Sequence, residues 1–560
     1  MIVPIEKLLL IHFYILILFS WLCPSHYMPW VSSHNDFSIF LALFFLGLYL
    51  VFKKNNLEIS KNFIFLVGLS ALPLFLWLLQ GSVFFGEALV SSIYIAGFSF
   101  AFFIAFNLAK ESEKVKLEVY KILSYLILLA CIVSVGIQLS QWLMIKTGNV
   151  FIIDLVPGGR PYANFAQPNN LATFLCLGLM ASLYIYERKY INGICGSLLA
   201  IFLLFGLALT QSRTPWIFSI CFAIWWLWKT YNLKVRFSKI RLLFFISVYI
   251  VFLVVIPCLS EFLGITTTAD IVSRATNGYL RLPMWHQMLI AIQHEPWVGY
   301  GWNQVSVAQI TVFLDYPTTE WIEHSHNILL DLIIWNGIPL GIVIILGFSW
   351  WLYQLSKLAT SIEIIIVLAM IGSVLVHAML EYPLEYAFFL LPVGFLLGLI
   401  QADQLNIKLF KINKRAFSVF LFFYLMLYIW IFGEYRVIEK DVELARFELA
   451  NIGEIHSEKA APNVILLTQL REQIRFMRTE PKSKMTSEQL KWMKHVAYRY
   501  AMPISLYRYA QALALNGQEA EAKRHLLIIQ KLYGRTYTYE SLFNKDATLA
   551  FKWNELSGSK

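Results

Sequence analysis

Charged side chains are scarce in this chain of 560 residues. They make up 14% of it, whereas hydrophobic residues make up 58%. Soluble globular proteins carry about 25% charged residues, so the composition excludes an ordinary soluble protein and indicates a membrane protein. Apolar runs such as 201–209 and 242–259 present almost no polar side chain to water. A run of about 20 predominantly apolar residues is long enough to span the hydrocarbon core of a bilayer.

Three motifs are also missing. The six cysteines lie in or beside apolar runs and none forms a C-x-x-C pair, which argues against a disulfide framework and against a thiolate metal site. No Asp-x-Asp pair occurs, so the chain lacks the acidic pair with which many transferases hold a divalent metal. No phosphate-binding Walker loop occurs either, and nucleotide hydrolysis is therefore not expected to drive this protein.

The apolar segments predict an all-α polytopic membrane protein with about thirteen transmembrane helices and a small helical C-terminal domain. We expect N-terminal transmembrane helices over residues 1–140 and a transmembrane core over 141–432 with long outside loops at 143–169 and 260–325. Charged residues become frequent after Gly433, so residues 433–560 should form the helical domain. The thirteen spans are expected to begin near residues 8, 36, 63, 88, 122, 170, 194, 216, 242, 326, 362, 387 and 416.

The basic residues indicate the orientation of the chain. The net charge of +10 is scattered through short loops, which favours a topogenic role in the bilayer over nucleic-acid binding. With the N-terminus in the cytoplasm, most lysines and arginines fall in inside loops, and an odd number of spans places the tail outside. Basic residues are disfavoured in outside loops, so arginines found there suggest a function. Arginine binds phosphate oxygens through a rigid fork. The outside loops before the tail carry only Lys146, Arg160, Arg213, Arg274 and Arg281.

One polar cluster stands where the second outside loop meets a membrane span. It contains Glu323, His324, His326 and Asn327. Histidine is the usual proton acceptor near neutral pH, and polar groups at membrane depth are costly unless they serve a cavity or a pathway. The alternative is a junction in which His or Asn only caps exposed backbone amides. Metal ligands on one helix face usually stand at i and i+4, so this closer spacing does not predict a metal site.

A second polar segment covers residues 158–172. Its Gly, Pro and Asn residues predict an irregular loop that leads into a span. The amides of Gln167, Asn169 and Asn170 offer donors and acceptors to a sugar or a phosphate, although a capping turn would also use such residues. Arg213 and Arg281 stand in comparable places, in Gln-Ser-Arg-Thr-Pro and Tyr-Leu-Arg-Leu-Pro-Met-Trp.

These motifs resemble those of a known family. Residues 281–285, the segment His-Glu-Pro-Trp-Val-Gly-Tyr-Gly at 294–301, and His326-Asn327 followed after nine residues by Gly337 resemble the O-antigen ligase and polymerase superfamily. The Gln-Pro-Asn-Asn-Leu-Ala segment at 167–172 and the helical tail are more similar to bacterial protein O-oligosaccharyltransferases of the PglL type. The resemblance covers about residues 140–400 and, loosely, the tail. The family pattern has a small residue or tyrosine three positions after the glycine, where this chain has Leu340, with Gly341 following.

The resemblance implies a reaction and a location. Members of this family transfer a glycan from undecaprenyl pyrophosphate to serine or threonine of a periplasmic protein such as a pilin, without metal or cofactor. The chain would lie in the bacterial inner membrane with its active site facing the periplasm. An O-antigen ligase that acts on the lipid A core and an O-antigen polymerase use the same donor, and both stay open. A transporter of the lipid-linked glycan is a further alternative.

The resemblance also implies roles for particular residues. His326, which starts the His-Asn-x9-Gly pattern, is expected to activate or orient the acceptor hydroxyl. Tyr382 is expected to be functional, with Tyr386 as the alternative. The expected pyrophosphate-binding residues are Arg213 and Arg281, and with them Arg160. The expected contacts of the glycan or the acceptor are Gln167, Asn169, Glu323 and Asn327.

Overall fold

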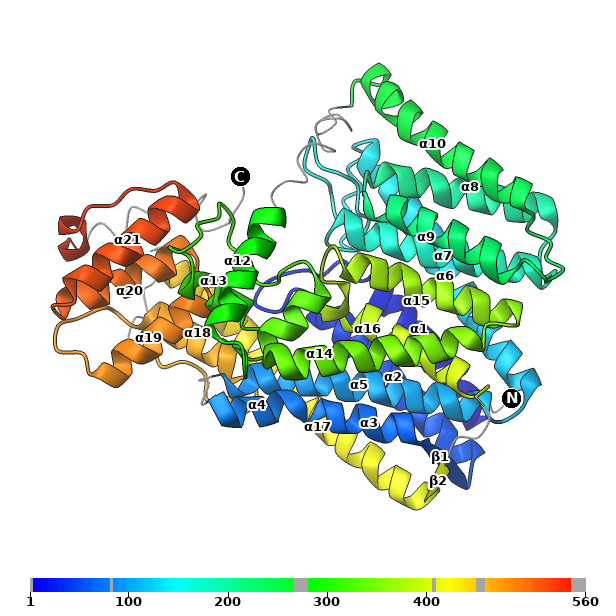
Figure 1. The fold of residues 1–560 in the computed structure, drawn as a ribbon, viewed down its shortest axis with the longest axis horizontal. Coiled ribbons are helices and arrows are strands. Elements are labelled where there is room, and N and C mark those ends of the chain that lie inside the picture. Colours follow the sequence, from blue (N-terminus) through cyan, green and yellow to red (C-terminus); the bar gives the residue numbers. More distant parts are fainter. Residues whose placement is uncertain (1–3, 81–83, 266–280, 405–408, 450–458, 545–560) are drawn as a thin grey trace. The chain divides into compact units, whose positions relative to one another are not determined.

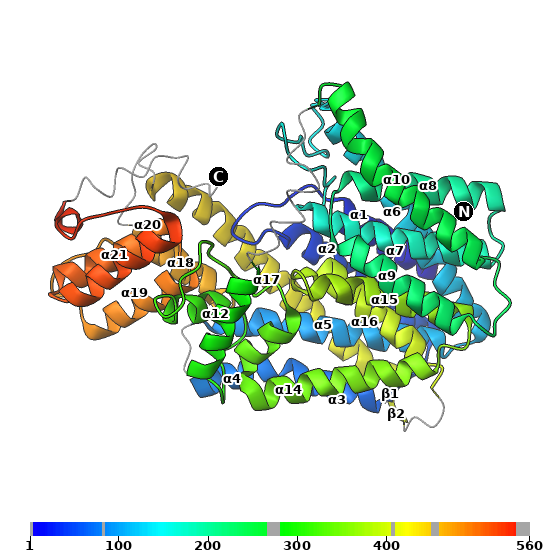
Figure 2. The same ribbon diagram turned by 45° about the horizontal axis from the view of Figure 1, so that its top comes forward.

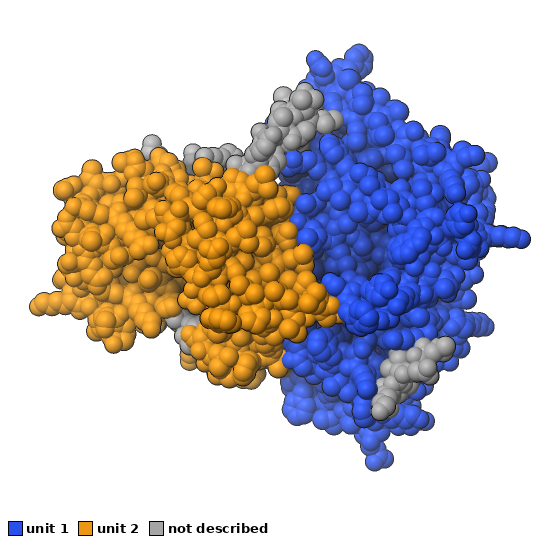
Figure 3. Space-filling view, viewed as in Figure 1, with its two compact units in different colours: residues 1–69, 94–278, 348–426 blue, residues 70–93, 279–347, 427–560 orange. Residues whose placement is uncertain are grey.

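The computed structural model describes residues 4–80, 84–265, 281–404, 409–449 and 459–544. Arg274, one of the cations expected in the second outside loop, lies outside the described residues. The chain divides into two compact units, which Figure 3 shows in blue and orange. Unit 1 comprises residues 1–69, 94–278 and 348–426, and unit 2 comprises residues 70–93, 279–347 and 427–560.

The long apolar runs form helices because a helix satisfies its own backbone hydrogen bonds, which water cannot do inside a bilayer. Among the described residues, nine helices are long and apolar enough to cross a membrane, and three further apolar helices are shorter. Each of the thirteen expected spans coincides with a helix, so the all-α polytopic fold is confirmed (Figure 1). These helices are α1 (Ile5–Leu22), α2 (Ser33–Lys53), α3 with α4 (Lys61–Ser70 and Leu72–Gln80), α5 (Phe85–Ala109), α6 (Glu113–Trp142), α7 (Pro168–Glu187), α8 (Gly193–Leu209), α9 (Thr214–Lys229), α10 (Lys239–Phe262), α14 (Ile328–Lys357), α15 (Ile362–Ala378), α16 (Ala387–Gln401) and α17 (Lys414–Leu449).

Among the described residues, helix α7 is the most enclosed of the long apolar helices. In its most apolar stretch 89% of the residues are buried, against 17% in α10. It packs against α6, α8, α9 and α15, and the views in Figures 1 and 2 agree on this bundle. The sequence allows this burial because small and apolar residues such as Ala172, Gly178 and Ala181 let neighbouring helices approach closely. Polar residues on α7 are therefore placed inside unit 1 and away from lipid.

A small antiparallel ribbon in unit 1 was not expected from the sequence. Strand β1 (Asn56–Ser60) pairs with β2 (Leu409–Asn413), with Asn56 opposite Asn413 and Ser60 opposite Leu409. Each strand is only five residues long, and an isolated ribbon of this size is marginal in water. Five residues give too short an alternating pattern to predict a strand from the sequence.

Unit 2 contains α12 (Arg281–His294), α13 (Val305–Thr311) and the tail helices α18 (Thr468–Arg478), α19 (Ser487–Arg499), α20 (Pro503–Leu515) and α21 (Glu519–Tyr533). Its core joins Phe84, Ile310 and Phe313 to apolar side chains of the tail such as Met493 and Ile529. The tail is helical, as expected, and α20 and α21 pack against each other.

Candidate functional site

The predicted site residues are divided between the two units, which are described in turn. Unit 1 contains Arg160, Gln167, Asn169, Arg213 and Tyr382. Unit 2 contains Arg281, Glu323, His326 and Asn327.

The loop between α6 and α7, which was expected to lie outside, is irregular but fixed by two buried amide side chains. The Nε2 of Gln141 donates to the carbonyls of Ile153 and Ala163, both at 2.9 Å, and its Oε1 accepts from the backbone of Tyr162 at 3.0 Å and of Ala163 at 2.7 Å. The Nδ2 of Asn164 donates to the carbonyl oxygens of Leu22 at 2.7 Å and Phe151 at 2.9 Å. Buried amides that are fully used in this way rigidify a loop. The loop carries Arg160, which is half-buried.

A polar cluster begins in the first turn of α7. The Oγ of Ser212 donates to Oδ1 of Asn169 at 2.7 Å, and Nδ2 of Asn169 donates to Oε1 of Glu381 at 3.1 Å. This chain of hydrogen bonds joins three helix ends, because Ser212 precedes α9 and Glu381 follows α15. Asn169 was expected to contact substrate, and its amide has both a donor and an acceptor partner in this cluster. Gln167 is the N-cap residue of α7, and its Nε2 donates to Oδ1 of Asn170 at 3.4 Å.

One turn deeper, the hydroxyl of Thr173 lies 2.9 Å from Nδ1 of His377. Both side chains are fully buried, Thr173 on α7 and His377 on α15. A polar pair at this depth is costly unless its members satisfy each other, and in membrane proteins it is commonly functional. The backbone amide of Glu381 donates to the carbonyl of His377 at 2.8 Å, so the buried pair and the cluster above it are held on one helix end.

Tyr382 stands between α15 and α16, at the N-cap of the short helix η2 (Pro383–Glu385). Its ring centroid lies 6.2 Å from that of Tyr386, and burial raises the pKa of Tyr386 well above its usual value. The start of α16 is fixed by Asp36, whose Oδ1 accepts from the amide of Ala387 at 2.9 Å and whose Oδ2 accepts from the hydroxyl of Tyr94 at 2.6 Å. The tyrosine loop is therefore anchored at its far end by a buried carboxylate.

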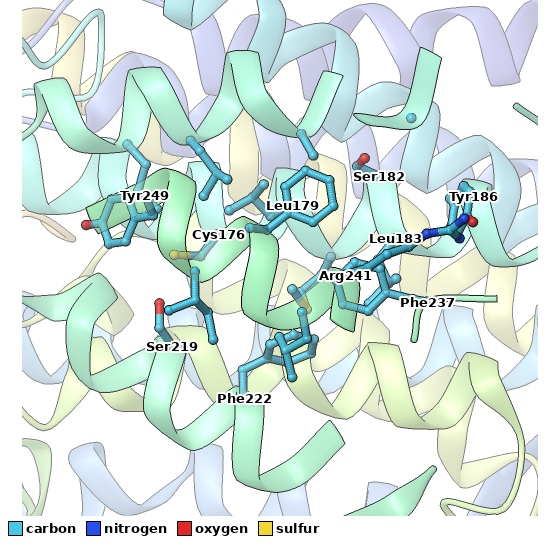
Figure 4. A pocket seen from close by; sticks show the side chains of 18 of the residues that line it. Cys176, Leu179, Ser182, Leu183, Tyr186, Ser219, Phe222, Phe237, Arg241 and Tyr249 are labelled. Carbon is cyan, nitrogen blue, oxygen red and sulfur yellow. The ribbon is translucent and has the colours of Figure 1, made fainter. Parts of the chain in front are cut away.

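Arg213 directly precedes α9 and lines a small hollow between α8, α9 and α10. The hollow is also lined by Gln211, Trp216 and Ile256. The same three helices, with α7, enclose a larger apolar cavity of about 920 Å³, its open mouth included. Figure 4 shows Tyr249 near one end of this cavity and Tyr186 near the other, with Cys176 and Leu179 between them. Its wall is mostly aliphatic and aromatic, which suits an apolar chain.

In unit 2, the segment before α14 is held at almost every residue. We call residues 320–327 the histidine loop. The amide of Ile322 donates to Oε1 of Gln309 at 3.0 Å, and Trp321 donates from Nε1 to Oγ of Ser306 at 2.6 Å. Nearer the histidines, the Nε1 of Trp285 donates to the carbonyl of Ser325 at 2.9 Å. The structure thus gives this loop, in which only Glu320 and Glu323 are exposed, a defined conformation.

His326 occupies the left-handed backbone region, with φ at +56°. Non-glycine residues are uncommon there, and Asn, Asp and His are enriched among those that do occur. The next residue, Asn327, caps α14, since its Oδ1 accepts from the amide of Leu329 at 3.0 Å. Asp331 in the first turn accepts from the amide of Ser325 at 2.9 Å and interacts electrostatically with His326. Asn327 therefore has the capping role that was the alternative to substrate contact.

His324 is in a different electrostatic environment. Desolvation, together with positive charge on Arg499 and His326, lowers the pKa of His324 to about 3. At neutral pH this imidazole is neutral and strongly disfavours taking up a proton. The environment of His324 thus makes it a poor proton acceptor.

Gly337, the glycine of the His-Asn-x9-Gly pattern, breaks α14. Its φ of +74° and ψ of 170° are outside the helical region, and a Cβ at this position would collide with the backbone of Trp297. The segment 296–301 takes over the interrupted hydrogen bonds, because the amide of Tyr300 donates to Ile334 and that of Ile338 donates to Pro296, both at 2.7 Å. The glycine spacing is therefore explained by the close approach of two backbones. Arg281 begins α12 and is half-buried.

Glu323 is paired with Arg499 at the end of α19. The Nη1 of Arg499 lies 2.9 Å from Oε1 of Glu323, and its Nε is hydrogen-bonded to Glu87 in the first turn of α5. Gln304 donates to the other oxygen of Glu87. Among the described residues, no group of three His, Cys, Asp or Glu side chains could hold a metal ion.

Sequence reasoning missed several of these residues. His377 and Glu381 stand four positions apart at the end of an apolar segment. This signal is visible in the sequence, because ionisable residues at membrane depth usually mark a functional site. Glu87 gives a similar signal near the start of an apolar run. Ser212 and Arg499 carry no local signal, because their roles depend on partners far away in the sequence.

Three family models match parts of this chain. Residues 198–345 match a model described as O-Antigen ligase, residues 161–186 match Protein glycosylation ligase, and residues 365–544 match Virulence factor membrane-bound polymerase, C-terminal. Together with the polytopic helical fold, these matches define a multi-pass membrane enzyme of the ligase and polymerase class.

Two curated relatives narrow the class. The chain is 31% identical to the General O-oligosaccharyltransferase of Acinetobacter baylyi over 548 residues, which cover 97% of this chain and 95% of that protein. It is 28% identical to the ComP-specific O-oligosaccharyltransferase of the same organism over 465 residues, which cover 82% of this chain and 83% of that protein. The chain belongs to the bacterial O-oligosaccharyltransferases of the PglL type, glycosyltransferases that move an oligosaccharide onto protein.

Proposed function

We propose that this chain transfers an oligosaccharide from undecaprenyl pyrophosphate to serine or threonine of a periplasmic protein such as a pilin. The active site would face the periplasm, with the chain in the inner membrane. This orientation is supported by the excess of lysine and arginine in the loops assigned to the cytoplasm.

The fixed histidine loop is the observation that carries the proposal. His326 has a backbone conformation that few residues adopt. Its two neighbours in the chain are both hydrogen-bonded, Ser325 to Trp285 and Asp331, and Asn327 to the amide of Leu329, which restricts the freedom of His326. A general base must be held in one place, because its contribution depends on reaching the proton that it removes. Asp331 lies where a negative charge would stabilise an imidazolium ion formed on His326.

The arginines and the apolar cavity support a lipid pyrophosphate donor. Arg213 lines a hollow between α8, α9 and α10, and the cavity of about 920 Å³ lies between the same helices and α7. Guanidinium groups suit phosphate oxygens, and an apolar slot suits an isoprenoid tail. We assign pyrophosphate binding to Arg213 and Arg281, with Arg160 as a third contact.

The reaction balances with these groups alone. The oxygen of the acceptor hydroxyl attacks the anomeric carbon, and the bond from that carbon to the pyrophosphate oxygen breaks. His326 takes the hydroxyl proton, undecaprenyl pyrophosphate leaves with its charge stabilised by arginine, and Tyr382 contacts the reacting groups. Direct displacement inverts the anomeric configuration. Gln167, Asn169, Glu323 and Asn327 would contact the glycan or the acceptor, or hold groups that do.

Co-expression in bacteria tests this function. The chain is produced with a lipid-linked glycan and a pilin, and the pilin is weighed by intact-protein mass spectrometry. We expect a mass increase of one glycan that is lost when the acceptor serine or threonine is replaced. An unmodified pilin accompanied by a modified lipid A core, or by longer lipid-linked chains, would contradict the proposal.

Two other acceptors are kept as alternatives because the family models that match are named for a ligase and a polymerase. An O-antigen ligase would modify the lipid A core, and a polymerase would extend another lipid-linked repeat. The same experiment distinguishes both from the proposed function, because each leaves the pilin unmodified. The two differ from each other in their product, which is a modified lipid A core for the ligase and a longer lipid-linked chain for the polymerase.

A further inference from the structure

Three charged side chains from distant parts of the chain meet beside the histidine loop. Arg499 is separated from Glu323 by 176 residues and from Glu87 by 412 residues. The side chain of Arg499 is 13% exposed and that of Glu87 is 5% exposed, whereas Glu323 is 45% exposed. The guanidinium thus spans from a buried carboxylate to one on the loop surface.

The neighbouring residue makes a second link to the same loop. Ser306 donates from Oγ to the carbonyl of Tyr498 at 2.6 Å and accepts from Nε1 of Trp321 at 2.6 Å. Tyr498 and Arg499 therefore hold the loop on both sides of Ile322. Both residues belong to the end of α19, in the tail.

This ion network is not explained by stability alone. Buried charge pairs are weak contributors to stability, because desolvation offsets much of the attraction, and apolar side chains of similar volume are often as good. A guanidinium fork does fix direction, because its planar donors engage two carboxylates in a defined geometry. The arrangement is therefore better suited to setting the position of the loop than to strengthening the fold.

We propose that Arg499 is a positioning residue for glycan transfer, which acts through Glu323 to hold the histidine loop where His326 can reach the acceptor hydroxyl. The proposal rests on the proposed function, because it requires His326 to be the base. It makes the tail a part of the active site's support, although the tail supplies no reacting group. It also gives Glu323 an indirect role.

Kinetics of purified full-length variants in lipid nanodiscs test this proposal. A displacement of about 1 Å can cost about 100-fold in rate, so Arg499→Gln should lower kcat about 100-fold and leave both KM values nearly unchanged. Glu323→Gln should cause a comparable loss, and the double variant should be no slower than either single variant, because both changes break the same contact between Arg499 and Glu323. Arg499→Lys should recover part of the rate, since it keeps the charge but not the fork.

Arg478 provides a matched control in the same unit. It also joins two carboxylates, Asp441 at 2.6 Å and Glu448 at 2.9 Å, and its side chain is 5% exposed. Among the described residues, its hydrogen bonds go to Asp441, Glu448 and the carbonyl of Ala460, none of which belongs to the histidine loop. Arg478→Gln should lower the melting temperature and leave kcat unchanged at a temperature where the variant is folded.

Several results would overturn the proposal. A wild-type kcat in Arg499→Gln shows that the network is only structural, and an increase in KM for the acceptor alone shows that it binds the acceptor instead. Loss of activity in Glu323→Gln but not in Arg499→Gln shows that Glu323 acts directly. Should Arg499→Gln not fold, a wild-type kcat in Arg499→Lys refutes the need for the fork. A wild-type enzyme that leaves the protein acceptor unmodified refutes the proposed function itself, before any variant is compared.

Discussion

Replacing His326 with asparagine separates its chemistry from its backbone conformation. His326 has φ at +56°, a region that Asn tolerates and in which Ala is strained by about 1–2 kcal/mol. A general base contributes typically about 10²–10⁴ in rate, so His326→Asn should lose a factor in this range with little change in melting temperature. His326→Ala should lose a similar factor in rate and should also be less stable.

Initial rates measured with saturating lipid-linked donor and acceptor in nanodiscs provide the assay, and thermal unfolding of the same samples monitors stability. Donor binding should be almost unchanged, because pyrophosphate binding is assigned to the arginines in the proposed function. His324→Asn is the matched control two positions away. Since its environment lowers the pKa of His324 to about 3, it cannot readily take a proton at pH 7, and its replacement should have a mild effect on rate.

Two outcomes would refute this reasoning. Full activity of His326→Asn would show that no imidazole is needed at this position, and the base would have to be sought at Tyr382 or Glu323. A larger rate loss in His324→Asn than in His326→Asn would show that the reaction needs His324 and that His326 is not the base.

The remaining predictions concern the donor, the tail and metal. Arg213→Ala and Arg281→Ala should abolish transfer with membrane insertion intact, and lysine should restore it only partly because it lacks the fork; full activity of both lysine variants would contradict this. Ala200→Trp fills the apolar cavity from α8 and should raise KM for a long isoprenoid donor, whereas Leu198→Trp on the exposed side of α8 should not; equal KM values would exclude the cavity as the tail site. Burial lowers the pKa of His525 to about 4, so the unfolded chain binds more protons between about pH 4 and 6.5, and the free energy of unfolding should decrease by up to about 3 kcal/mol as the pH falls from about 6.5 to about 4. Melting temperatures against pH should show this slope in the wild type and a weaker one in His525→Asn, and an identical slope in both would contradict the assignment. Transfer should survive strong chelation, and a reaction that stops and is restored by magnesium or manganese would point to a carboxylate site not recognised in this account.

Much of the fold was predictable because it follows from local sequence. A span is identified by its own hydropathy, which is why every expected span coincides with a helix. The strands β1 and β2 were not predictable, since each depends on a partner more than 300 residues away and has too few residues for a clear pattern. The spacing between His326 and Gly337 could be read from the sequence, but its cause could not, because it lies in the backbone of Trp297.

The candidate site follows the same division. His326 and Arg213 stand in short, unusual motifs and could be singled out from sequence. Ser212 and Arg499 could not, because nothing in their surroundings reveals that they bind Asn169 and Glu323. The capping role of Asn327 was one of two readings of its sequence position, because asparagine commonly caps a helix where a loop enters it, and its contact with substrate stays a prediction.

Reconstitution from purified components tests the central claim most directly. The chain in nanodiscs is mixed with an oligosaccharide on undecaprenyl pyrophosphate and a purified pilin, without nucleotide or added metal, and the pilin is weighed over time. We expect the pilin to gain the mass of one glycan at a serine or threonine while undecaprenyl pyrophosphate is released in equal amount. An unchanged pilin mass with the donor consumed in another product would contradict it.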